Sequence, residues 1–182
     1  MSQSRISFPC NIRFCAAAFA AIALMSSAPD ANAAPPQLYN KSITVTWGES
    51  GVYKRISDGV NVSPSGQFQR IYYISGAGRV FTRGTNKSGQ YGGSREAGPE
   101  KTADSVKFEG NSLVAVGVNL GVARRLSAMF DAGFSSCTAS VTIGKSGAGT
   151  RITGFDGAVY EVISMQPGAI SCSIRDGNAF TN

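Results

Sequence analysis

Residues 137–143 read Cys-Thr-Ala-Ser-Val-Thr-Ile, and this stretch decides the fold class. Apolar positions alternate with hydroxyl-bearing ones, so that one face carries Cys137, Ala139, Val141 and Ile143, and the other carries Thr138, Ser140 and Thr142. A period of two is typical of a strand with one face in a core and one in solvent. The stretch therefore predicts a half-buried strand with a cysteine on its apolar face.

The same alternation recurs on both sides of this strand. We predict further strands at 42–47, 52–56, 68–74, 79–82, 106–108, 113–118, 159–165 and 170–174. Turn residues separate them at 48–51, 58–59, 63–66, 75–78 and 166–169, and the last two turns predict hairpins. Many short strands with turns every 8–12 residues favour an all-β, mostly antiparallel β-sandwich or a small barrel.

Residues 122–130 fit two interpretations. Helical spacing groups Val122 and Leu126 with Met129 or Phe130, whereas strand spacing also aligns Arg124 with the apolar residues. Glycines at 121 and 133 leave little room for a long helix, so we favour a strand with Arg124 on its apolar face.

The cysteines predict one disulfide. Cys10 and Cys15 lie in the N-terminal leader, which leaves Cys137 and Cys172 as a pair, each on the apolar face of a predicted strand. The disulfide would join two stacked sheets or two neighbouring strands. Immunoglobulin-like domains keep a tryptophan between their cysteines, but Trp47 precedes both, and no family resemblance is assigned.

Residues 1–33 have the pattern of a secretory signal peptide. Arg5 and Arg13 precede an apolar run at 14–25, and a small-residue cleavage site ends at Ala33. The run is shorter than the roughly 20 residues of a membrane-spanning helix. We therefore expect a single β-rich domain at 34–182, exported from a bacterial cell to the periplasm or the medium, with no integral membrane segment after cleavage.

The charge of the chain is mildly basic. Its formal net charge is +6, with 17 basic and 11 acidic residues; removing Arg5, Arg13 and Asp30 leaves 15 and 10, a net of +5. Such a balance favours an anionic partner, either an anionic glycan or an envelope protein. Because the basic residues are scattered, we do not expect nucleic acid as a partner. None of these features sets an oligomeric state.

The chain has no histidine. This excludes Ser-His-Asp and Cys-His nucleophile systems and histidine-ligated zinc, and we expect no metal and no cofactor. Carboxylate chemistry remains open, with Glu161 in an apolar strand and Asp131 near a turn as the residues to test. No catalytic residue is assigned, and the absence of histidine weighs against an enzyme.

Aromatic and basic residues gather around the predicted hairpin at 68–82. The candidate ligand-binding residues are Arg70, Tyr72, Tyr73, Arg79, Phe81, Arg83 and Tyr91. Adjacent Tyr72 and Tyr73 must point to opposite faces, so one is expected to be exposed, beside arginines that suit a sugar ring, an anionic glycan or a protein. Tyr91 lies within a polar, glycine-rich stretch, 84–104, that we predict to be a mobile or functional loop.

The sequence thus favours a secreted or periplasmic, non-enzymatic binding or interaction protein. Two alternatives stay open: a carboxylate-dependent enzyme acting on envelope polysaccharide, and an inhibitor or structural envelope protein that presents the 84–104 loop.

Overall fold

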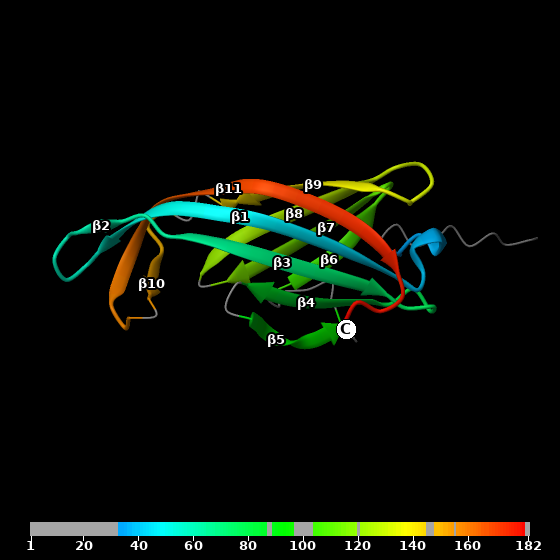
Figure 1. Ribbon diagram of the computed structural model, residues 1–182, viewed down its shortest axis with the longest axis horizontal. Helices are drawn as coiled ribbons and strands as arrows, with labels where there is room; N and C mark the ends of the chain where they lie inside the picture. Colours follow the sequence, from blue (N-terminus) through cyan, green and yellow to red (C-terminus); the bar gives the residue numbers. More distant parts are fainter. Residues whose placement is uncertain are drawn as a thin grey trace, which may run out of the picture.

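Two antiparallel sheets form the protein (Figure 1). The computed structural model describes residues 33–86, 89–96, 104–119, 121–144, 148–154 and 156–180. The larger sheet has the order β10 (Arg151–Thr153), β11 (Val159–Asp176), β1 (Lys41–Arg55), β3 (Ser65–Ile74), β4 (Val80–Asn86) and β5 (Gly89–Glu96), with β2 (Asn61–Val62) paired to β1. The smaller sheet has the order β6 (Asp104–Glu109), β7 (Ser112–Asn119), β8 (Val122–Phe130) and β9 (Cys137–Ile143). A short 3-10 turn, η1 (Pro36–Leu38), precedes β1. The prediction of an antiparallel β-sandwich is confirmed.

The core lies between the two sheets. Ile43, Val45 and Trp47 of β1 point inward, and Leu113, Ala115, Leu126 and Ala128 of the smaller sheet meet them. Residues 122–130 are a strand, as favoured, because the even-numbered positions from Val122 to Phe130 face the core while Met129 is 61% exposed. Burial of these alternating side chains is the main source of stability for such a fold.

A disulfide closes one side of the sandwich. Cys137, the first residue of β9, is bonded to Cys172 of β11, with a Cα–Cα separation of 5.6 Å. The two strands belong to different sheets, and both cysteines pack against the core. The predicted pairing is confirmed, and of the two positions that the sequence left open the structure has the one between stacked sheets.

The predicted turn at 48–51 is wrong, because β1 runs without interruption from Lys41 to Arg55. Its partner strands continue on both sides, and a register shift against β11 between Trp47 and Glu49 absorbs the glycine-rich stretch. A Cβ added at Gly51 would lie 2.5 Å from the Ser164 carbonyl oxygen. This glycine permits a close approach of two strands and does not mark a turn.

The predicted hairpin across 166–169 is also wrong. Residues 159–176 form one long strand, β11, which pairs with β1 along almost its whole length. β10 pairs with β11 only at 159–161, so in the described residues no strand is hydrogen-bonded to that side of β11 at Pro167. A proline, which has no amide hydrogen to donate, is tolerated at such a position.

The predicted loop at 84–104 is wrong over most of its length. β4 continues to Asn86, and β5 occupies Gly89–Glu96 at the edge of the larger sheet. An edge strand needs no alternating apolar pattern, which is why the sequence here resembles a loop. Residues 87–88 and 97–103 lie outside the described residues.

The signal peptide and membrane-spanning helices are the remaining points on which the sequence made a prediction. The predicted signal peptide falls on residues 1–33, of which 1–32 lie outside the described part. In the part of the chain that the structure describes, no helix has the length and hydropathy needed to cross a membrane.

Candidate ligand-binding face

The β3–β4 hairpin separates the two adjacent tyrosines, as predicted. Tyr72 is 2% exposed and faces the core opposite Thr82, whereas half-buried Tyr73 lies on the outer face opposite Phe81. The hairpin closes through the predicted turn, in which the Gly78 amide donates to the Ser75 carbonyl at 2.9 Å, and Gly78 adopts a φ of 76°. A glycine meets that positive φ without strain.

Three aromatic rings meet on the outer face and form what we call the outer aromatic cluster: Tyr73, Phe81 and Phe180. Tyr73 and Phe81 are roughly parallel, 29° apart with centroids 6.4 Å apart, and Phe180 stands edge-on to Tyr73 at 73° and 6.2 Å. Both arrangements are favourable for aromatic pairs. The rings therefore form a platform and a wall that meet at an angle.

Two arginines pack on this cluster. The Arg79 guanidinium lies 5.7 Å from the centroid of Phe81, and that of Arg83 lies 4.8 Å from the centroid of Phe180. Arg83 also donates through Nη1 to the Phe180 carbonyl oxygen at 2.8 Å. Such stacking holds both the rings and the cations in place.

The C-terminal segment, residues 177–180, supplies the wall. Ser42, a fully buried serine on β1, donates to the Gly177 carbonyl at 2.7 Å and accepts from the Ala179 amide at 2.9 Å. The Gly177 amide donates to the Asn40 carbonyl at 2.7 Å. Sequence reasoning missed Phe180, because nothing in the sequence links it to a hairpin about a hundred residues earlier.

The outer face carries arginine side chains. Arg175 of β11 is in register with Ser42 and is exposed, which adds a third arginine to Arg79 and Arg83. Glu96 of β5 is the acidic residue in register with Phe81. The side chains of Arg79, Arg83 and Arg175 thus lie on the described part of this face, and their positive charge suits an anionic partner.

The remaining candidate residues lie elsewhere. Arg70 shares the inner-face register of Tyr72 and sits opposite Val45 and Gly84. Tyr91, on β5, is in register with Gly84 of β4, and the side chain of Tyr91 lies outside the described part of the structure. The structure thus brings Tyr73, Arg79, Phe81 and Arg83 together and separates Arg70 and Tyr72 from them.

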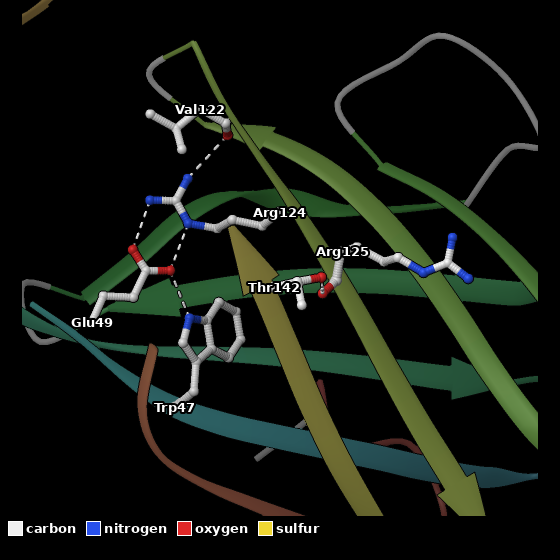
Figure 2. A network of polar contacts seen from close by, with 6 residues as sticks. All are labelled: Trp47, Glu49, Val122, Arg124, Arg125 and Thr142. Atoms are coloured by element: carbon white, nitrogen blue, oxygen red, sulfur yellow. Dashed lines mark hydrogen bonds and ion pairs between the residues drawn. The ribbon is translucent and has the colours of Figure 1, made fainter. Parts of the chain in front are cut away.

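A second polar arrangement lies between the sheets (Figure 2). Glu49 of β1 accepts from Trp47 Nε1 at 2.7 Å, and from Nε and Nη2 of Arg124 at 2.6 and 2.7 Å. The exposed fractions of the two charged side chains are 3% for Glu49 and 13% for Arg124. Arg124 also donates to the Val122 carbonyl at 3.1 Å. The buried ion pair ties β1 to β8.

Aromatic side chains surround the ion pair of Glu49 and Arg124. Figure 2 shows Arg124 and Arg125 extending in opposite directions from β8, and Arg125 is exposed. The Arg124 guanidinium lies 5.7 Å from the centroid of Phe68, which stacks on Trp47 at 5.8 Å. Burial raises the pKa of nearby Tyr53, and the charge of Glu49 adds to the rise. Sequence reasoning placed Arg124 on the apolar face but missed its partner, because Glu49 fell in a predicted turn.

Of the two carboxylates named as catalytic candidates, Asp131 is held by hydrogen bonds within its own turn. Asp131 accepts from the amides of Ser135 and Ser136 and from the Ser135 hydroxyl, and these bonds lower its pKa to about 2. Glu161 on β11 is in register with Lys54 on one side and Arg151 on the other. The lowered pKa favours the ionised form of Asp131 at neutral pH, which weighs against a role as general acid.

Asp156 and Glu109 also accept side-chain hydrogen bonds. Tyr160 donates to Asp156 at 2.6 Å, which lowers the pKa of Asp156 and raises that of Tyr160. The hydrogen bond from Lys107 lowers the pKa of Glu109. Within the described residues, no group of three or more His, Cys, Asp or Glu side chains could hold a metal ion.

Comparison with protein-family models, with curated proteins and with solved structures finds no match for this chain.

Proposed function

We propose that this chain is an exported, non-enzymatic binding protein whose ligand site is the outer face of β3 and β4. The observation that carries the proposal is the joining of the outer aromatic cluster with Arg79 and Arg83 on one solvent-facing surface. Half-buried rings offer apolar area to a ligand at little entropic cost, since they are already fixed by their neighbours.

The chemistry of this face favours an acidic glycan over a protein. Aromatic rings stack against the C–H face of a pyranose, and a surrounding arginine field favours carboxylate-bearing sugars. The rings are few and lie next to hydroxyl and amide side chains, whereas a protein interface has an extended apolar centre. An envelope protein as partner is an outcome of the test below.

A carboxylate-dependent enzyme is the weaker alternative. Glycoside hydrolysis needs two carboxyl groups on either side of the cleaved bond, one of them able to donate a proton. Asp131 is held ionised, and the Glu49 carboxylate is buried and accepts three hydrogen bonds. Unchanged turnover of acidic polysaccharide by Glu161→Gln and Asp131→Asn would exclude these two residues from catalysis.

An inhibitor or structural envelope protein is the other alternative. It depended on a loop at 84–104 that would present a surface, and β4 and β5 occupy most of that stretch. The binding proposal depends on no loop.

The test is calorimetric titration of the purified, disulfide-bonded protein with oligogalacturonate. We expect Tyr73→Ala and Phe81→Ala each to weaken binding about tenfold or more, the equivalent of about 1.4 kcal/mol. Arg79→Ala should weaken binding and reduce its salt dependence, whereas Arg151→Ala, an exposed arginine on β10, is the matched control and should have no effect. Equal binding by all four variants would refute the proposal.

Export is part of this proposal. The leader pattern at 1–33 and the disulfide between Cys137 and Cys172 both suit an oxidising compartment outside the cytoplasm of a bacterium. N-terminal sequencing of the protein recovered from the periplasm or medium should begin at Ala34. Recovery of an uncleaved, reduced chain from the cytoplasm would contradict export.

A further inference from the structure

The outer face continues from the aromatic cluster into a row of hydrogen-bonding side chains. Gln69 of β3 donates through Nε2 to Thr46 Oγ1 at 3.4 Å and accepts at Oε1 from Thr85 Oγ1 at 3.3 Å. We call Thr46, Gln69 and Thr85 the polar ladder. The ladder crosses β1, β3 and β4 and orients the central amide.

The cluster and the ladder lie on the same face along one strand. Tyr73 and Gln69 are four positions apart on β3, with Ile71 between them on the same face, so their side chains share the outer face. The rise of a strand puts them about 13 Å apart. That span exceeds one sugar ring and suits a short linear chain.

The C-terminal segment borders this track beside Tyr73 and Arg83. Phe180 stands edge-on to Tyr73, and its segment is fixed by Ser42 and Arg83. At the other end, Thr46 and Thr85 flank the Gln69 amide. A chain bound at the corner of Tyr73 and Phe180 that extends along β3 reaches this amide.

We propose that the ligand is the end of a linear acidic glycan, with its terminal ring in the corner of Tyr73 and Phe180 and the following rings along β3 to the polar ladder. The inference rests on the proposed function and adds chain length and direction to it. Aromatic stacking selects the terminal ring, and the Gln69 amide and the two threonine hydroxyls bond to hydroxyl or carboxylate groups further along.

The experiment is a chain-length series. Wild-type protein and Gln69→Ala are titrated with galacturonic acid, its dimer and longer oligomers, and with neutral cello-oligosaccharides for comparison. We expect affinity to rise from monomer to longer oligomer in the wild type. Gln69→Ala should lose roughly two- to tenfold in affinity for the long oligomers, as one or two hydrogen bonds would give, and nothing for the monomer.

Three outcomes would overturn the inference. Equal affinity for short and long oligomers, unaffected by Gln69→Ala, would restrict binding to the aromatic corner and leave the proposed function intact. Binding of polyglutamate as tight as that of oligogalacturonate would replace the glycan by an acidic peptide. Oligomer binding that Tyr73→Ala does not weaken would refute both the track and the proposed function.

A second pair of ligands tests the direction of the chain. Blocking the terminal ring with a bulky group should abolish binding if the ring enters the walled corner, whereas internal units of a long polymer need no free end. If end-blocked oligomers bind as tightly as unblocked ones, the chain does not terminate at Phe180 and the inference fails.

Discussion

The two faces of the larger sheet carry the same kinds of residue, aromatic and charged, in different surroundings. On the inner face, Tyr72 is buried in the core and Glu49 completes an ion pair with Arg124. On the outer face, Tyr73 and Arg83 remain partly accessible and contact neighbouring rings. The difference teaches that position on the strand, and not residue type, decides whether an aromatic or charged side chain is buried in the core or stays accessible to a ligand.

Glu49→Ala should have the largest effect on stability, since it leaves the mostly buried Arg124 without its ion-pair partner. We expect a loss of about 3–5 kcal/mol in the free energy of unfolding, measured by urea titration. Gln69→Ala on the outer face of the same sheet is the matched control and should cost no more than about 1 kcal/mol.

The ion pair itself is tested by a double variant. Glu49→Met combined with Arg124→Met should recover much of the stability, because apolar replacements leave no unpaired charge. A double variant as unstable as Glu49→Ala would show that the cost arises from lost packing, and a stable Glu49→Ala would remove the contrast between the faces.

Removal of the disulfide should have the next largest effect. The loop between Cys137 and Cys172 spans 35 residues, for which the chain-entropy model gives about 3–4 kcal/mol. Cys137→Ala combined with Cys172→Ala should lower the urea midpoint, and reductant should do the same to the wild type alone. If ligand affinity at the outer face fell by as much as stability, the two faces would not be separable.

Most of the fold could be predicted from sequence, for a physical reason. Alternation identifies a strand wherever one face is buried and the other is not, as at 137–143 and 122–130, and it also separates Tyr72 from Tyr73. Alternation fails where a strand contains glycine or proline inside a sheet, as at 48–51 and 166–169. There, hydrogen bonds to the partner strands keep the chain extended although its residues have a low strand propensity.

Little of the candidate site could be predicted. Tyr73, Arg79, Phe81 and Arg83 share one hairpin, and local spacing is enough to group them. Phe180 reaches Tyr73 because residues 177–180 pack across β1. This contact joins distant parts of the chain, so no local sequence pattern predicts it. The same holds for Glu49 and Arg124, which are 75 residues apart and meet only when the sheets stack.

Thr82→Val should stabilise the protein. The Thr82 hydroxyl is buried on the inner face and has no hydrogen-bond partner among the described residues, so an isosteric apolar side chain removes a desolvation cost of about 1–3 kcal/mol. Thr85→Val, on the outer face of the same strand, removes a hydroxyl that bonds to Gln69 and should be neutral or slightly destabilising. A destabilising Thr82→Val, measured by urea unfolding, would contradict the assignment of this face to packing.

The smallest expected effect is a pH dependence at the β8–β9 turn. The pKa of Asp131 is about 2, below its ordinary value of 3.8, because serine donors stabilise the ionised form. Its contribution is therefore present above about pH 4 and lost as the pH falls towards 2. The melting-temperature difference between wild type and Asp131→Asn should shrink over that interval.

The Ser135→Ala variant gives a second readout, because loss of that donor should raise the pKa of Asp131 in a carboxyl NMR titration. A difference in melting temperature that stays constant across the interval would contradict the assigned hydrogen bonds.

The most direct test of the central claim, that the outer face binds ligand while the inner face holds the fold, is an amide NMR titration of the wild-type protein with oligogalacturonate. The account predicts that shifts concentrate in residues 69–73, 81–85 and 177–180, while the amides of β8 and β9 stay unchanged. Shifts confined to β8, β9 or the turn at 131–136, with none on β3 and β4, would contradict it.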